Sequence, residues 1–179
     1  MDTTLSQFDH HWLPNAALLG KMKVLAIDDE PANVALLEAM LADGGYTRVK
    51  SVTDSRVALQ TFEAFEPDIV LLDLMMPHLD GFAVLEAIRG VDTEIFLPII
   101  VLTADANEAT KLRALRAGAT DFLLKPFDQL EVLLRMANLL ETRRVHLQLD
   151  MQVAAYADAV RERTSELREA RGQLEAVRS

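Results

Sequence analysis

The sequence predicts an α/β protein with a five-stranded parallel sheet, followed by one long C-terminal helix. Five short, strongly apolar runs lie between Lys23 and Leu124. Amphipathic stretches with helical spacing separate these runs. After Phe127 the composition changes, because residues 128–179 contain no proline and one glycine, Gly172. Repeated strand–helix alternation is typical of a parallel sheet that carries helices on both faces.

The five predicted strands should differ in burial. Three consist almost entirely of Val, Ile and Leu and should be covered on both faces, whereas the second alternates and suits a sheet edge. In chain order the predicted strands are Lys23–Asp28, Thr47–Val52, Asp68–Asp73, Pro98–Thr103 and Thr120–Leu124.

The predicted helices each place apolar residues on one face. The first has Val34, Leu37 and Leu41 at helical spacing, and glycines at positions 44, 45 and 118 mark helix ends. In chain order the predicted helices are Ala32–Ala42, Ser55–Phe65, Phe82–Ile88 and Ala109–Ala117, with a last helix beginning near Asp128.

The C-terminal helix carries an imperfect heptad repeat. With Val153 at position a, polar residues interrupt the seam, among them Arg163 at d and His146 at a. A single helix of this kind, roughly 75 Å long, would expose its apolar seam. We therefore expect a homodimeric coiled coil through Val153, Tyr156, Val160, Leu167, Leu174 and Val177.

Composition excludes several classes of function. The chain has no cysteine, so disulfides and thiolate chemistry are excluded. The net charge is −10, and residues 1–128 hold 20 acids and 10 bases while residues 129–179 hold 8 of each. Such a surface disfavours direct nucleic-acid binding. No apolar run is long enough to span a membrane and no secretory signal is apparent, so we expect a cytoplasmic location.

Five polar residues fall at the carboxyl ends of predicted strands. Asp28 and Asp29 follow the first strand, Asp73 ends the third, Thr103 ends the fourth and Lys125 follows the fifth. Ligands of open α/β sheets bind at this edge. Three close carboxylates repel each other unless a hard cation such as Mg²⁺ binds between them. A hydroxyl and an ammonium beside that site suit phosphoryl transfer.

Each of these residues also has an ordinary structural interpretation. Asp28 or Asp29 could cap the following helix, and Asp73 could be a turn residue. Thr103 could be a strand-end cap for the next helix, and Lys125 could be a solvated surface lysine. Their conjunction at one edge of an apolar framework favours the functional interpretation.

Four runs of residues resemble the bacterial two-component response-regulator receiver family. They are VLAIDDE (Val24–Glu30), DIVLLDLMMPHLDGF (Asp68–Phe82), PIIVLTA (Pro98–Ala104) and GATDFLLKPF (Gly118–Phe127). The resemblance covers about residues 22–140. It implies a flavodoxin-like (βα)5 doubly wound sheet with strand order 2-1-3-4-5. It also implies that Asp73 takes a phosphoryl group from a sensor histidine kinase or a phosphotransfer protein.

The resemblance also assigns roles to the other site residues. Mg²⁺, or Mn²⁺, would be held by Asp29, Asp73 and the Met75 backbone carbonyl, with Asp28 acting mainly through a bound water. Thr103 would hydrogen-bond the phosphoryl group and Lys125 would pair with it. A cis peptide before Pro126 would aim the lysine inward. Thr103 and Phe122 would form the conformational switch, which here works through packing because Phe122 has no hydroxyl.

The predicted domains are an N-terminal extension (1–20), the receiver (21–140) and a coiled-coil signalling helix (141–179). LLETRRVHLQL (Leu139–Leu149) is similar to the linker of receiver proteins with HD-GYP cyclic-dinucleotide phosphodiesterase domains. A simple dimerisation rod is the alternative. We expect an output domain after the coiled coil.

The predicted function is a phosphorylation-controlled signalling domain whose only chemistry is self-directed phosphotransfer and autodephosphorylation. An aspartyl-nucleophile phosphatase is one alternative, but such enzymes usually carry a general acid two residues after the nucleophile, where this chain has Met75. A dimerisation module independent of phosphorylation is the other, and it predicts loss of a site residue, whereas all are present.

Overall fold

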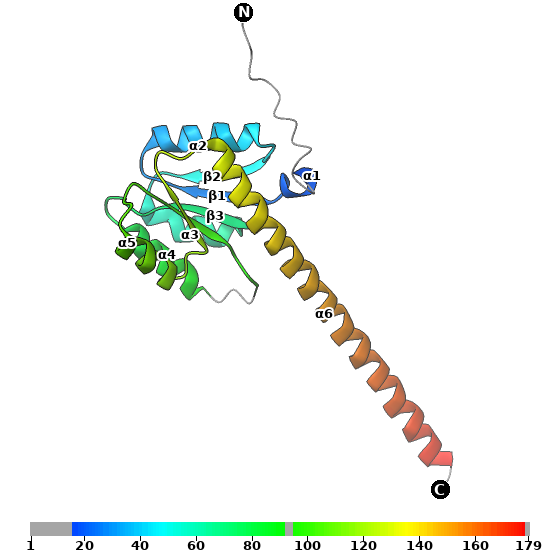
Figure 1. The fold of residues 1–179 in the computed structure, drawn as a ribbon. Helices are drawn as coiled ribbons and strands as arrows, with labels where there is room; N and C mark the ends of the chain where they lie inside the picture. The colour runs from blue at the N-terminus through cyan, green and yellow to red at the C-terminus, as the bar shows by residue number, and fades with distance from the viewer. Residues whose placement is uncertain (1–15, 92–94, 178–179) are drawn as a thin grey trace, which may run out of the picture. The chain divides into compact units, whose positions relative to one another are not determined.

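The computed structural model describes residues 16–91 and 95–177, with only the backbone described for Ala16, Leu174, Glu175 and Val177. The chain divides into two compact units, residues up to Arg143 and residues from Arg144 onward, and each is considered by itself. The elements (Figure 1) are α1 (Ala16–Leu19), β1 (Lys23–Ile27), α2 (Pro31–Asp43), β2 (Arg48–Val52), the 3₁₀ turn η2 (Ser55–Val57), α3 (Ala58–Phe65), β3 (Ile69–Asp73), α4 (Gly81–Gly90), β4 (Ile99–Thr103), α5 (Glu108–Arg116), β5 (Asp121–Leu124) and α6 (Gln129–Val177).

The sheet has five parallel strands in the order β2-β1-β3-β4-β5, which confirms the predicted topology. Val24 of β1 lies opposite Val49 of β2 on one side and Ile69 of β3 on the other. The chain reverses its direction of winding between β1 and β3. Ligands of doubly wound sheets bind at such a switch point.

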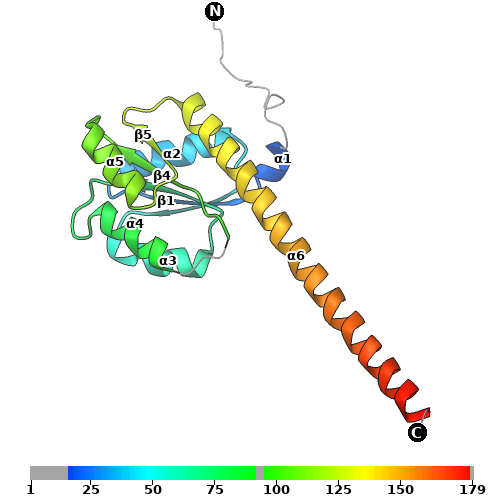
Figure 2. The ribbon, with the colours of Figure 1, turned by 60° about the horizontal axis from the view of Figure 1, so that its bottom comes forward.

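Residues alternate between two apolar cores, one on each face of the sheet. On β3, Val70 and Leu72 pack with α3 and α4, whereas Ile69 and Leu71 pack with α2 and the first turns of α6. Figure 2 shows α3 and α4 on one face of the sheet and α2 on the other. A strand covered on both faces should read as continuous apolar sequence, which is what β1, β3 and β4 show.

β2 lies at the sheet edge, as its alternating sequence predicts. One predicted helix differs from the structure, because Ser55–Phe65 begins as a 3₁₀ turn and becomes α-helical at Ala58. The cause is local hydrogen bonding: the Asp54 carboxylate accepts from the Arg56 N–H at 3.0 Å. The Ser55 hydroxyl also donates to the Pro77 carbonyl at 3.0 Å, which holds this turn against the loop after β3.

Part of the predicted N-terminal extension contacts the receiver. Leu19 is buried in the core on the α2 face, and the Gly20 carbonyl accepts hydrogen bonds from the N–H and hydroxyl of Thr47. Residues 1–15 of the predicted extension lie outside the described residues.

The predicted coiled-coil seam lies on α6. Val153, Tyr156, Val160 and Leu167 are between 64% and 73% exposed in the single chain. The side chains of Leu174 and Val177 lie outside the described residues. Within the described part of the chain, no helix is long and apolar enough to cross a membrane.

Candidate functional site

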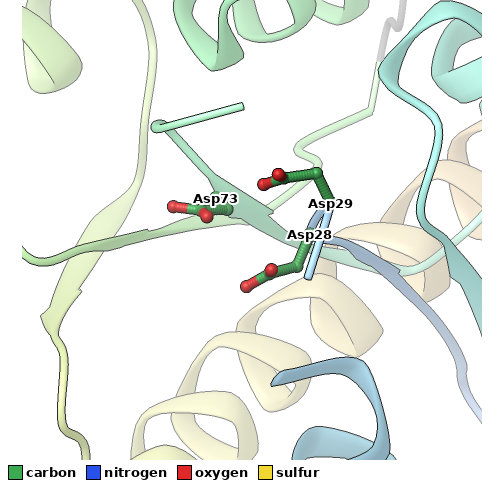
Figure 3. Close-up of side chains that lie close together, drawn as sticks. All are labelled: Asp28, Asp29 and Asp73. Carbon is green, nitrogen blue, oxygen red and sulfur yellow. The ribbon is translucent and has the colours of Figure 1, made fainter. Parts of the chain in front are cut away.

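Three aspartates meet at the carboxyl edge of the sheet. Asp28 and Asp29 directly follow β1 and Asp73 ends the neighbouring strand β3. Each offers a carboxylate oxygen, and these oxygens all lie within 4.8 Å of one another. Figure 3 shows the three carboxylates pointing to the same side. Asp28 and Asp73 are buried and Asp29 is half-buried.

Asp28 is held in place by α2. Its Oδ1 accepts hydrogen bonds from the Glu30 N–H at 3.0 Å and from Asn33 Nδ2 at 3.1 Å, and Asn33 Nδ2 also lies 3.2 Å from Oδ2. Sequence reasoning missed Asn33. Its position in the first turn of a helix that begins at Pro31 was the available signal. The helix is capped by Glu30, so neither Asp28 nor Asp29 serves as its N-cap.

Lys125 joins two of the carboxylates. Its Nζ lies 2.7 Å from Asp28 Oδ2 and 2.9 Å from Asp73 Oδ2, and its side chain is 19% exposed. The structure therefore contradicts the alternative of a solvated surface lysine. Burial on its own would lower the pKa of Lys125, but the hydrogen bonds and charges of Asp28 and Asp73 outweigh it and raise this pKa above its usual value. The peptide between Lys125 and Pro126 is cis.

Thr103 and Phe122 lie on the neighbouring strands β4 and β5. Thr103 is 1% exposed, and its Oγ1 accepts a hydrogen bond from the Asp105 N–H at 3.0 Å. The helix that follows, α5, is capped by Asn107, whose side chain accepts from the Ala109 N–H, so Thr103 is not the cap of that helix. Phe122 is half-buried against the core on the α3 and α4 face. The Lys111 ammonium of α5 lies 4.7 Å from the centroid of the Phe122 ring.

The loop after β3 positions the acceptor candidate. The Met75 N–H donates to Asp73 Oδ1 at 3.2 Å, and Met75 is 70% exposed. His78 is exposed and has a φ of 70°, a left-handed conformation that non-glycine residues seldom adopt. Asp80 caps α4 by accepting from the Phe82 N–H at 3.1 Å. Asp73 Oδ1 thus accepts from the Met75 N–H, whereas Asp73 Oδ2 contacts the Lys125 ammonium.

The donor set fits a hard divalent cation. All three neighbouring groups are carboxylates, and Mg²⁺ and Mn²⁺ prefer oxygen ligands. Asp28 and Asp73 sit in a buried environment where an unneutralised cluster of negative charge would be costly. Asp28, Asp29 and Asp73 are therefore the residues that would hold such an ion. The Met75 carbonyl remains a prediction from the resemblance.

Residues 24–137 match the family described as the response regulator receiver domain. The response regulator PleD of Caulobacter vibrioides is 38% identical over 117 residues, which are 65% of this chain and 26% of PleD. The alkaline phosphatase synthesis transcriptional regulatory protein PhoP of Bacillus subtilis is 37% identical over 123 residues, which are 69% of this chain and 50% of PhoP. The chain thus spans half or less of the length of these two relatives.

Solved structures agree with this match. The receiver domain of the sensor histidine kinase PA1611 from Pseudomonas aeruginosa, with a magnesium ion in its active-site cleft, superposes with a TM-score of 0.62. It is 34% identical, over 68% of this chain and 98% of that domain. A two-component system response regulator/GGDEF domain protein has a TM-score of 0.66 at 29% identity, over 72% of this chain and 52% of that protein. The fold, the site and these matches together show that the chain belongs to the response regulator receiver family.

Proposed function

We propose that Asp73 is the phosphoacceptor of a two-component signalling system and is loaded from a phosphohistidine of a sensor histidine kinase or phosphotransfer protein. The observation that carries the proposal is the joining of Asp28 and Asp73 by Lys125 within a cluster of three aspartates. The site has an acceptor carboxylate and a cationic partner, Lys125, but Met75 stands where a phosphatase would carry its general acid. A phosphohistidine donor accounts for this combination. The kinship with response regulators supports the same assignment.

In the proposed phosphoryl transfer the protein mainly positions the reacting groups and stabilises charge. A carboxylate oxygen of Asp73 attacks phosphorus, an O–P bond forms, and the N–P bond to the donor imidazole breaks. Bound Mg²⁺ would neutralise negative charge on the transferring group. Lys125 contributes a positive charge within 2.9 Å of the acceptor carboxylate, and Asn33 keeps Asp28 oriented toward the site. The chemistry is self-directed, so this chain would not be a turnover enzyme for small molecules.

Phosphorylation replaces the single negative charge of the Asp73 carboxylate with a group of about two negative charges beside Thr103 and Lys125. The Thr103 hydroxyl, which now accepts from Asp105, would turn to donate to the phosphoryl group, and Phe122 would fill the space that it leaves. A structure with beryllofluoride bound at Asp73 tests this switch. Thr103 and Phe122 in unchanged rotamers would contradict it.

We propose that the signal leaves through a dimeric coiled coil of α6, whose apolar seam is exposed in the single chain. The matched relatives are longer than the segment they share with this chain, which supports an output domain joined to the coiled coil. A cyclic-dinucleotide phosphodiesterase is our candidate because Leu139–Leu149 is similar to the linker of receiver proteins with HD-GYP domains. Sedimentation of the chain at tens of micromolar tests the dimer. A monomer both with and without beryllofluoride would contradict it, and Val160→Glu is the variant expected to separate the two copies.

Labelling by radioactive acetyl phosphate tests the acceptor. Wild type should incorporate about one phosphoryl group per chain, only with Mg²⁺ present, as an acyl phosphate that hydroxylamine releases. Asp73→Asn should abolish incorporation, while Asp80→Asn, at an acid of the neighbouring loop, should retain it. Incorporation that persists in Asp73→Asn would refute the assignment. Sustained release of phosphate from many organic phosphates would favour a phosphatase.

A further inference from the structure

An arginine fastens the last receiver turn of α6 to segments that precede two strands of the sheet. Leu140 is fully buried and is the last buried apolar residue of α6 in the described part of the chain. Arg143 follows one turn later, with a side chain that is 14% exposed, and it is the last residue of the first compact unit. The attachment of α6 to the receiver therefore ends with a polar contact rather than with core packing.

The Arg143 guanidinium contacts two segments far away in sequence. Nη1 donates to the carbonyl oxygens of Ile95 at 3.1 Å and Phe96 at 2.7 Å. Nε lies 3.8 Å from Asp68 Oδ1, which is an ionic contact rather than a hydrogen bond. The other Asp68 oxygen accepts from the Lys23 N–H at 2.8 Å, so the carboxylate itself is fixed in place.

The two contacted segments precede β3 and β4, the strands that carry Asp73 and Thr103. Asp68 immediately precedes β3, which ends at Asp73, and Phe96 lies three residues before β4, which ends at Thr103. A five-residue strand spans about 17 Å. The same two strands thus hold the proposed acceptor and its hydroxyl partner at one end and the Arg143 contacts at the other.

A hollow of about 340 Å³ beside Arg143 offers the guanidinium a second position. It is lined by apolar side chains, including Phe62 and Leu97, and by the acidic residues Glu63 and Glu66. Arginine pairs well with carboxylates, and such pairs are stronger than bonds to neutral carbonyls. The guanidinium therefore has both room and oppositely charged partners outside its present contacts.

We propose that Arg143 is a two-position latch on α6. In the present position it holds the last receiver turn to the entry ends of β3 and β4. When Asp73 is occupied, Arg143 turns toward Glu63 and Glu66 and that turn of α6 loosens. This regulation rests on the proposed function of Asp73, whereas the holding contact does not.

Hydrogen exchange on the full chain, followed in peptides covering residues 138–147, tests the latch. Without ligand, Arg143→Ala should exchange on the order of 10-fold faster than wild type there, because it loses hydrogen bonds from a charged donor. The control is Thr142→Ala, because Thr142 is exposed and its hydroxyl donates to the Asn138 carbonyl of the same helix at 3.1 Å. In this control the exchange rate of the same peptides should stay within about twofold of the wild-type rate. Equal exchange in both variants would overturn the holding contact.

Beryllofluoride with Mg²⁺ tests the regulation, with occupancy of Asp73 followed by fluorine NMR. The exchange rate in residues 138–147 should rise in wild type and in Thr142→Ala, and it should stay unchanged in Arg143→Ala. It should rise only weakly in the double variant Glu63→Gln/Glu66→Gln. Bound beryllofluoride without a change in wild-type exchange would overturn the regulation. Failure of beryllofluoride to bind would instead refute the proposed function of Asp73, and the ligand-free comparison would still decide the holding contact.

Discussion

Replacing Gly81 by alanine should destabilise the chain and displace Asp73, the proposed acceptor. Gly81 opens α4, and a Cβ there would overlap the carbonyl oxygen of Asp73 and lie 2.5 Å from the Cα of Leu74. Both neighbours are backbone atoms, so no change of rotamer relieves the overlap. Gly90, at the other end of the same helix, has no atom within 4 Å of an added Cβ and provides the control.

The structure sets the size of the effect. Ordinary contact begins at 3.4 Å, so the Leu74 backbone or α4 would have to move by about 0.9 Å. Overpacking of this kind typically costs 1–3 kcal/mol, and because backbone atoms of a buried strand must give way we expect about 3 kcal/mol. Gly90→Ala should instead stabilise by about 0.5 to 1 kcal/mol, since alanine loses less backbone entropy in a helix.

Urea unfolding of both variants, together with acetyl phosphate labelling, measures these effects. The two substitutions add the same methyl group to one helix and should change the free energy of unfolding in opposite directions. Gly81→Ala should also slow labelling, because its overlap falls on the residue proposed to react. Gly81→Ala with wild-type stability and labelling would show that the reasoning from backbone overlap is wrong.

Two further predictions concern buried ionisable groups. Lys125→Met should lower the free energy of unfolding in EDTA by about 3 kcal/mol, because Asp28 and Asp73 lose their cation, and excess Mg²⁺ should restore more stability to the variant than it adds to wild type. Equal Mg²⁺ effects in urea titrations would contradict this. Burial raises the pKa of Tyr46 from 10.0 to about 12. The contribution of Tyr46 to the free energy of unfolding is therefore intact below pH 10 and should decline by roughly 3 kcal/mol as pH approaches 12. Tyr46→Phe should remove this loss from the stability profile.

Much of the fold could be predicted from local patterns. The continuous apolar runs of β1, β3 and β4 and the alternation of β2 identify strands covered on two faces and one edge strand. Prediction was weaker where side chains compete with the backbone for hydrogen bonds. Asp54 and Ser55 turn the start of the second predicted helix into a 3₁₀ turn. Asp54 does so through its neighbour Arg56, and Ser55 through a distant partner, Pro77.

In the candidate site, too, some residues could be predicted from local patterns and others could not. Asp28, Asp29, Asp73, Thr103 and Lys125 were identified because parallel strands bring their carboxyl ends to one edge. The partners of these residues were not identifiable in that way. Asn33 bonds to Asp28, and Lys125 Nζ bridges two carboxylates rather than pointing to solvent, because of side-chain positions that no spacing rule specifies.

The sequence by itself determined the order of strands and helices and the residues at the sheet edge, because burial periodicity and strand-end position are local properties of the chain. Its four motifs also carried the resemblance to the receiver family. Only the tertiary structure decided which groups touch: the bridge from Lys125 to two aspartates, the overlap that excludes a side chain at Gly81, and the fastening of α6 by Arg143. The Lys125 and Arg143 contacts join residues tens of positions apart, and the distances in all three contacts follow from how the packed layers meet.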